Sequence, residues 1–98
     1  MPAKIIVPKK VRTQLQSIVD WYAEQSGIAP DAFIREIDLF IGKIGRNPER
    51  FAIKQDNLRI CRLEIFPYYI IYQYYPNKHH VVIQKVVHAK RNPANKFI

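Results

Sequence analysis

The residues best suited to chemistry lie near the C-terminus, where His88 is followed by Lys90 and Arg91. Histidine titrates near neutral pH and can act as a general acid or base, while the two cations can hold a phosphate group. Metal-free cleavage of RNA through the 2′-hydroxyl needs such a set. A structural interpretation competes with it, in which the His88 ring bonds a backbone group at the end of a strand.

Further basic and aromatic side chains occupy the predicted strands. Arg59 and Arg62 are three residues apart, so they point to opposite faces and only one can join a given site. Five tyrosines crowd the next predicted strand, with one face carrying Tyr68, Tyr72 and Tyr74 and the other Tyr69 and Tyr75. These rings either stack nucleobases or fill the core beneath the helices, and the core interpretation is favoured. Trp21 lies just off the apolar stripe of the first predicted helix, which leaves it available to a partner.

The charge is strongly basic: 16 Lys and Arg against 8 Asp and Glu give a formal net charge of +8. Such a surplus favours an anionic partner. Residues 1–19 and all residues after Glu64 contain no acid, and they hold Lys4, Lys9, Lys10, Arg12, Lys78, Lys85, Lys90, Arg91 and Lys96. If the first strand pairs within the sheet, these two segments form one positive surface for RNA, DNA or an acidic peptide.

Composition and motifs exclude several protein classes. The 98 residues are expected to form a single domain spanning residues 1–98, with residues 93–98 as a flexible tail. A lone cysteine, Cys61, and the lack of any run of about 18 apolar residues predict a cytoplasmic protein with no membrane partner. No Gly-rich phosphate loop, metal-spaced His and Cys cluster or nucleophile elbow is found, so we expect no cofactor and no metal.

The hydrophobic spacing predicts an α+β fold. Lys4 to Val7 reads as a short strand. Apolar residues at helical spacing then predict an antiparallel helical hairpin, one helix running from about Lys9 to Gln25 and the other from Pro30 to about Gly45. Three strand-like runs follow, at Leu58 to Ile65, Tyr68 to Tyr75 and Val81 to Val87. The predicted order is β-α-α-β-β-β, with the hairpin covering one face of a three-stranded antiparallel meander.

Several short segments, in this order and spacing, resemble the RelE/ParE superfamily of type II toxin–antitoxin toxins. They are Asn47-Pro48 with Phe51, then Arg59, then Phe66 to Tyr72, and finally Val87 to Pro93. The resemblance spans nearly the whole chain and implies a RelE/ParE-like fold. It also implies a compact bacterial toxin of the plasmid-stabilisation kind, held inactive by a cognate antitoxin.

The two branches of that superfamily imply different targets. RelE-like toxins cut mRNA in the ribosomal A site, with an arginine on the central strand and often a tyrosine near the C-terminus. Matched to that pattern, this chain has Tyr69 in place of the arginine and Phe97 in place of the tyrosine, while it retains Arg91. A phenyl ring cannot exchange a proton, so the nuclease set is incomplete. The Phe66-Pro67-Tyr68 segment and the His88 to Pro93 ending look more like ParE toxins, whose studied members poison DNA gyrase.

Three functional hypotheses follow. The leading one is a ParE-like toxin that binds DNA gyrase without performing bond chemistry. The alternative is a RelE-like, metal-free endonuclease that cuts mRNA on the ribosome, with catalysis by His88 and Arg91 and support from Lys90, Arg59 and Lys54. The third is a non-toxic relative that only binds its antitoxin. In each case the expected partner is an acidic antitoxin, and oligomers are expected to form only through the complex with it. The residues expected to contact the target or the antitoxin are Lys54, Arg59, Lys90, Arg91 and Trp21.

Overall fold

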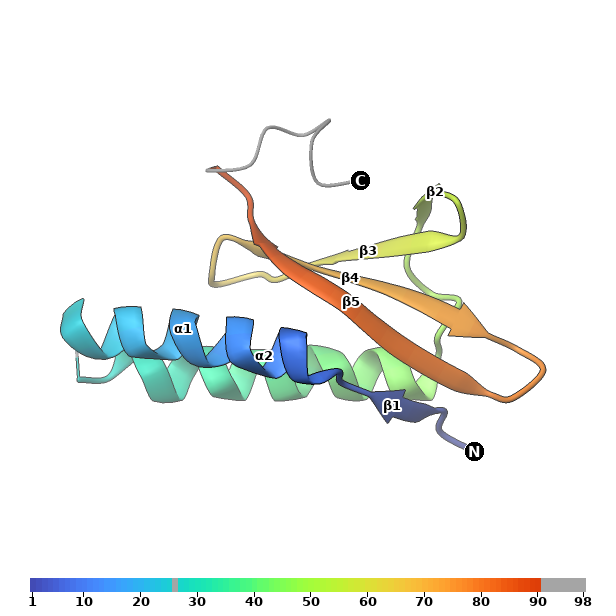
Figure 1. Cartoon of the computed structure of the whole chain (residues 1–98), viewed down its shortest axis with the longest axis horizontal. Helices are drawn as coiled ribbons and strands as arrows, with labels where there is room; N and C mark the ends of the chain where they lie inside the picture. The colour runs from blue at the N-terminus through green and yellow to red at the C-terminus, as the bar shows by residue number, and fades with distance from the viewer. Residues whose placement is uncertain (26, 91–98) are drawn as a thin grey trace.

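The computed structural model describes residues 1–25 and 27–90, and Arg91, a predicted site residue, lies outside them. The chain folds as two antiparallel helices packed against one face of a twisted sheet (Figure 1). Its elements are β1 (Lys4–Ile6), α1 (Lys9–Gln25), α2 (Ala29–Arg46), β2 (Ile53–Gln55), β3 (Leu58–Arg62), β4 (Tyr68–Tyr75) and β5 (His80–His88). The α+β class predicted from the sequence is confirmed.

The sheet has the strand order β1-β5-β4-β3-β2. β1 pairs parallel with the start of β5, whereas the other neighbouring strands are antiparallel. β1 therefore does join the sheet. The short strand β2, which was not predicted, adds a second edge beside β3. The strand predicted over Leu58 to Ile65 ends earlier, at Arg62, because the chain then enters the β3–β4 turn.

A register shift in the β4–β5 pair keeps the core face of β5 continuous. Tyr72 pairs with Ile83 and Ile71 with Lys85, so Gln84 is the extra residue. Strand side chains alternate between faces, and one inserted residue changes which residues point inward. Val81, Ile83 and Val86 consequently all face the helices and are buried.

The core lies between the helices and this face of the sheet. α2 contributes an apolar stripe of Phe33, Ile37, Phe40 and Ile44, as predicted. Tyr68 and Tyr72 are buried at 3% and 0% exposure, which confirms that tyrosines of this face fill the core. The Tyr72 hydroxyl donates a 2.7 Å hydrogen bond to the Pro48 carbonyl. Burial raises the pKa of this hydroxyl to about 12.

Two tertiary contacts fix the N-terminal segment. The Ala3 N–H donates to the Gly45 carbonyl at 2.8 Å, where the end of α2 runs close to the N-terminal segment. The His79 ring lies between the Tyr74 hydroxyl at Nδ1, 2.8 Å, and the Met1 carbonyl at Nε2, 2.7 Å. Because a carbonyl only accepts, the hydrogen of neutral His79 is on Nε2. Neither described helix is long and apolar enough to cross a membrane.

Candidate functional site

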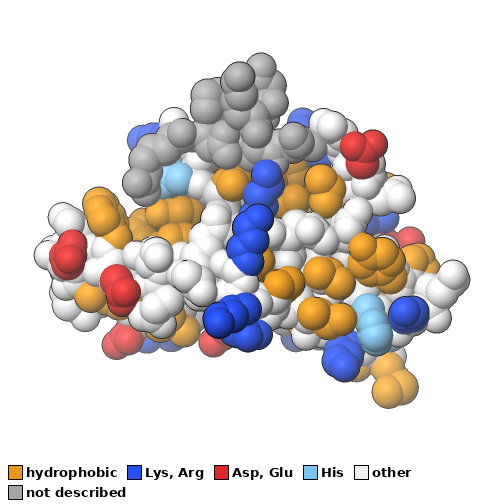
Figure 2. Space-filling model, viewed as in Figure 1, with side chains coloured by type: hydrophobic (Ala, Val, Ile, Leu, Met, Phe, Trp, Pro, Cys, Tyr) orange, Lys and Arg blue, Asp and Glu red, His pale blue; other side chains and the backbone are white. Residues whose placement is uncertain are grey.

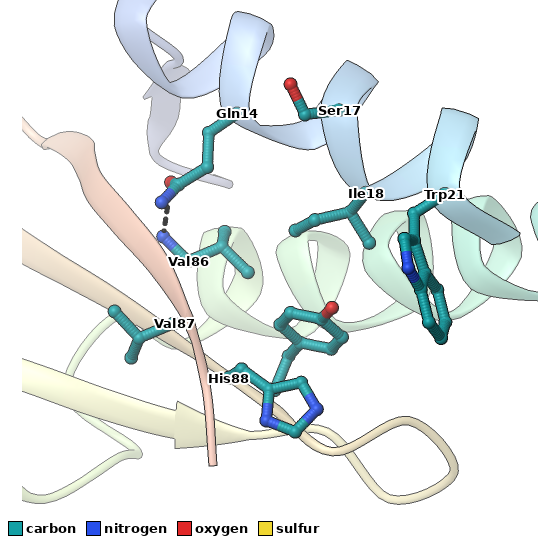
Figure 3. Close-up of a pocket in the computed structure, with 8 residues that line it drawn as sticks. Gln14, Ser17, Ile18, Trp21, Val86, Val87 and His88 are labelled. Atoms are coloured by element: carbon teal, nitrogen blue, oxygen red, sulfur yellow. Dashed lines mark hydrogen bonds between the residues drawn. The ribbon is translucent and has the colours of Figure 1, made fainter. Parts of the chain in front are cut away.

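A groove, here called the α1–β5 groove, separates the first helix from the end of the last strand (Figure 3). Its volume is about 460 Å³, and it is lined by Gln14, Ser17, Ile18, Trp21, Tyr68, Val86, Val87 and His88. β1 pairs with β5 only over residues 80–82, so among the described residues the β5 edge that faces away from β4 has no strand beside it from Ile83 onward. There the Val86 N–H donates instead to the Gln14 side-chain oxygen at 2.9 Å.

His88 lies in this groove, on the helix-covered face of the sheet. It pairs with Tyr68 across the sheet, and the two rings meet edge to face at 5.0 Å. Its Nδ1 accepts the Lys90 backbone N–H at 3.0 Å, so the hydrogen of neutral His88 is on Nε2. The predicted hydrogen bond between the His88 ring and a backbone group at the end of the strand is therefore confirmed. A catalytic role for His88 stays a prediction.

Trp21 projects into the same groove from the far end of α1 (Figure 3). Its side chain is 47% exposed, in agreement with its predicted position beside the apolar stripe. Its ring meets Tyr22 at 5.1 Å, and a run of ring contacts continues through Phe66, Phe33 and Tyr68 to His88. Close-packed rings have few alternative rotamers, so the groove has a rigid wall with one exposed aromatic side chain.

Other predicted site residues lie elsewhere. Arg59 uses Nη1 to bond two backbone carbonyls, of Phe51 at 2.7 Å and Glu49 at 3.1 Å, which ties the segment after α2 to β3. Lys54 is exposed on the edge strand β2. Since β3 and β4 stand between β2 and β5, Lys54 and His88 are separated by three strand spacings, at least about 14 Å. The structure thus brings Trp21 and His88 together, with Lys90 following, but neither Lys54 nor Arg59.

The opposite face of the sheet, here called the open face, carries a different set of side chains. Arg62 pairs with Tyr69 in register, donates to its hydroxyl at 3.1 Å and lies 5.3 Å from its ring centre. Lys85 lies on this face opposite Ile71. Sequence analysis placed Lys85 only on a general positive surface and left open whether Arg59 or Arg62 joins a site. Strand alternation was the available signal for the face of Arg62, but pairing it with Tyr69 required the register between β3 and β4.

The two faces therefore differ in chemistry. The groove on the helix side offers an apolar wall, one histidine and an unpaired strand edge, which suits an inserted peptide. The open face offers a guanidinium held against a tyrosine, which suits a phosphate or carboxylate. The sheet lies between His88 and Arg62, so these two side chains cannot act on one reacting group.

Comparisons with known proteins agree with this architecture. Residues 5–93 match the family described as the ParE toxin of the type II toxin–antitoxin system parDE. No curated protein matches the chain.

Three solved structures illustrate the shared fold. A chromosomal ParDE toxin–antitoxin system from Pseudomonas aeruginosa is similar with a TM-score of 0.77 at 14% identity, over 90% of this chain and 97% of that one. An archaeal RelE–RelB complex from Pyrococcus horikoshii has a TM-score of 0.63 at 21% identity, covering 93% and 99%. The isolated Escherichia coli RelE toxin has a TM-score of 0.61 at 12% identity, covering 92% and 87%. Because the family match spans most of the residues that build the sheet and both helices, the chain belongs to the ParE toxin family of type II toxin–antitoxin systems.

Proposed function

We propose that this protein is a ParE-like toxin that stops growth by poisoning DNA gyrase and is neutralised by a cognate acidic antitoxin. The proposal is supported by the family match and by the incomplete set of groups for RNA cleavage. In this mechanism the toxin stabilises a complex of gyrase with cleaved DNA by binding alone. Gyrase itself breaks and rejoins the DNA, so the toxin needs no general acid or base of its own.

The observation that carries the proposal is the position of His88 relative to the cations. Cleavage through a 2′-hydroxyl requires a proton-transfer group and a phosphate-binding cation within hydrogen-bond reach of one phosphate. His88 stands on the helix side of the sheet with only Lys90 following it among the described residues, whereas Arg62 and Lys85 are on the open face. Arg59 bonds backbone carbonyls. The described residues thus favour a binding protein over a nuclease.

A reconstituted gyrase assay tests this mechanism. Purified protein is added to gyrase, ATP and relaxed plasmid, and we expect supercoiling to fall or linear DNA to accumulate. The antitoxin added first should restore gyrase activity. Unaltered gyrase together with codon-positioned cuts in ribosome-bound mRNA would contradict the proposal and support the RelE-like alternative.

One contact favours that alternative enough to test it. Tyr69 occupies the position where RelE-like toxins carry an arginine, yet the Arg62 guanidinium reaches the same place from the neighbouring strand. If Arg62 stabilised the mRNA phosphate at which the strand is cut, Arg62→Gln would abolish both mRNA cleavage and growth arrest. Arg35→Gln, on the exposed side of α2, is the matched control. Full growth arrest by Arg62→Gln would exclude the nuclease role of this side chain.

Antitoxin binding is assigned to the α1–β5 groove within the same proposal. An extended or helical antitoxin tail can place an apolar side chain against Trp21 and Ile18, and a strand laid along β5 would continue the sheet. Acidic residues of the tail would be attracted to the surrounding positive charge of the protein. Induction of the gene without its antitoxin should arrest growth. Normal growth would instead indicate the non-toxic, antitoxin-binding relative.

A further inference from the structure

A second hollow lies at the opposite end of β5, on the open face, and is here called the β1–β5 pocket. Its volume is about 420 Å³, and its lining includes Ile6 of β1, Val82 and His80 of β5, and the β4–β5 turn with Tyr75, Pro76 and Lys78. Ile6 pairs with Val82 and Tyr75 with His80. Since their neighbours Ile5 and Val81 pack into the core, Ile6 and Val82 point away from the helices. The pocket is therefore separated from the α1–β5 groove by the sheet.

The floor of the pocket is apolar and held in place. Ile6 and Val82 are half-buried, and the Tyr75 ring is 44% exposed. The Tyr75 hydroxyl donates to the Gln73 side-chain oxygen at 2.7 Å, and the same oxygen accepts the Gln84 amide at 3.0 Å. The ring is thus oriented before any partner arrives, which lowers the entropic cost of binding.

The margin of the pocket is basic. Lys78 and His80 belong to the lining, and Lys4 pairs with His80 on the same face. No residue of the lining carries a carboxylate. Figure 2 shows hydrophobic side chains gathered on the right of this view, where β5 begins, with a histidine and Lys or Arg side chains at their margin. Such a surface complements a segment that combines an apolar side chain with acidic neighbours.

We propose that the β1–β5 pocket is a second anchor for the antitoxin, which it binds by seating an aliphatic or aromatic side chain of an acidic, extended segment. This inference rests on the antitoxin half of the proposed function and is independent of the gyrase half. A protein segment is favoured over nucleic acid because branched aliphatic side chains, Ile6 and Val82, form the floor. Nucleobases are held by stacking on flat rings, and of the seven lining residues only Tyr75 and His80 have one.

The two antitoxin sites are close enough for one tail to occupy both. Val82 in the pocket and Val86 in the groove are four residues apart on β5, which is about 13 Å along the strand. About four extended residues cover that distance along the strand, and a few more would carry the tail over the strand edge from one face to the other. Once the groove is occupied, filling the pocket becomes an intramolecular step at high effective concentration. The affinity of the whole tail then exceeds that of either site.

The test measures binding of the co-encoded antitoxin to the full-length toxin by interferometry. Lys4→Glu combined with Lys78→Glu reverses two charges at the margin, and we expect Kd to rise by about tenfold or more, with a weaker dependence on salt. Val82→Thr keeps the shape of the side chain and suits a strand but places a hydroxyl on the apolar floor, so dissociation should be about threefold faster or more. Arg35→Glu, on the exposed side of α2, is a single charge reversal away from the pocket and should change Kd less than twofold. Thermal unfolding of each variant checks the fold.

The outcomes separate the hypotheses. Variants at the pocket with the same Kd as Arg35→Glu would overturn this inference while leaving antitoxin binding intact. If the pocket variants lost binding to a labelled single-stranded oligonucleotide but kept their affinity for the antitoxin, the pocket would be a nucleic-acid surface and the inference would be overturned. Failure of the unmodified toxin to bind the antitoxin would contradict the antitoxin half of the proposed function.

Discussion

Glu36 and Phe66, thirty residues apart, are joined by a hydrogen bond of 3.0 Å between the carboxylate Oε1 and the backbone N–H. The other oxygen accepts the N–H groups of Glu64 at 3.0 Å and Ile65 at 2.7 Å. A side chain of α2, only 5% exposed, thus satisfies three backbone donors of the β3–β4 turn. Burial of this carboxylate is tolerated because it is fully hydrogen-bonded. The contact fixes Phe66, whose ring supports Tyr22 beside Trp21 in the groove.

Removal of this carboxylate should destabilise the protein substantially. Glu36→Ala leaves the three N–H donors without their acceptor, and we expect the free energy of unfolding to fall by about 2–4 kcal/mol. Denaturant unfolding measures the loss. Glu24→Ala, at an exposed position of α1, is the control and should change stability by less than about 0.5 kcal/mol. Equal stabilities for the two variants would show that the turn does not depend on Glu36.

Gly45 should tolerate one added carbon but not a branched side chain. A Cβ at this position would lie 3.4 Å from Ile5 Cδ1 and 3.7 Å from the Ala3 carbonyl, which are ordinary contact distances. Alanine is also the better helix former, by about 1 kcal/mol, so Gly45→Ala should be neutral or stabilising. Gly45→Val would press further methyl groups against β1 and should lower the melting temperature. A lower melting temperature for Gly45→Ala would show that α2 and the N-terminal segment are too close at Gly45 to accept a Cβ without strain.

Alkaline pH should destabilise the fold through two buried acids. Burial raises the pKa of the Cys61 thiol from an ordinary 9.0, and that of Tyr72 from 10.0, to about 12 in each case. The unfolded chain therefore releases these protons first, so the stabilising contribution is complete below pH 9 and is lost as pH rises to about 12. Denaturant unfolding between pH 8 and pH 11 should show this decline.

Thiol chemistry provides a separate check on the same burial. Cys61 is 0% exposed and is the only cysteine of the chain. We expect it to resist a thiol reagent at pH 8 in the folded protein and to react with one equivalent after unfolding in guanidinium. Rapid reaction of the folded protein would show that β3 opens readily.

Trp21 should be an energetic centre of the antitoxin interface if the α1–β5 groove receives the antitoxin. Exposed tryptophans that become buried in a complex commonly contribute 2 kcal/mol or more, so Trp21→Ala should raise the antitoxin Kd by about thirtyfold. Ile53→Ala removes an equally exposed apolar side chain, 54% against 47%, from the distant strand β2 and is the control. The same Kd for both variants would move the antitoxin away from the groove.

Helix limits and most of the core were accessible from the sequence because they depend on local spacing. α1 occupies the predicted residues, and the stripe from Phe33 to Ile44 predicted the buried side of α2. Glu36 was missed although its position gave a signal. It lies three residues after Phe33 and four before Phe40, so helical spacing places a carboxylate within the apolar stripe. The three exposed residues of β2 show no such pattern, and their strand exists only because β3 offers a free edge.

By itself, the sequence determined the fold class, the basic character and the family, since these depend on composition, short-range periodicity and the order of motifs. Only the tertiary structure decided which functional side chains share a surface. Gln14 meets Val86 across 72 positions of the chain, and Arg62 meets Tyr69 through the register of two strands. A shift of one residue in that register would move Arg62 to the other face, because neighbouring strand residues point in opposite directions. Register is set by packing of the whole core, which no local pattern encodes.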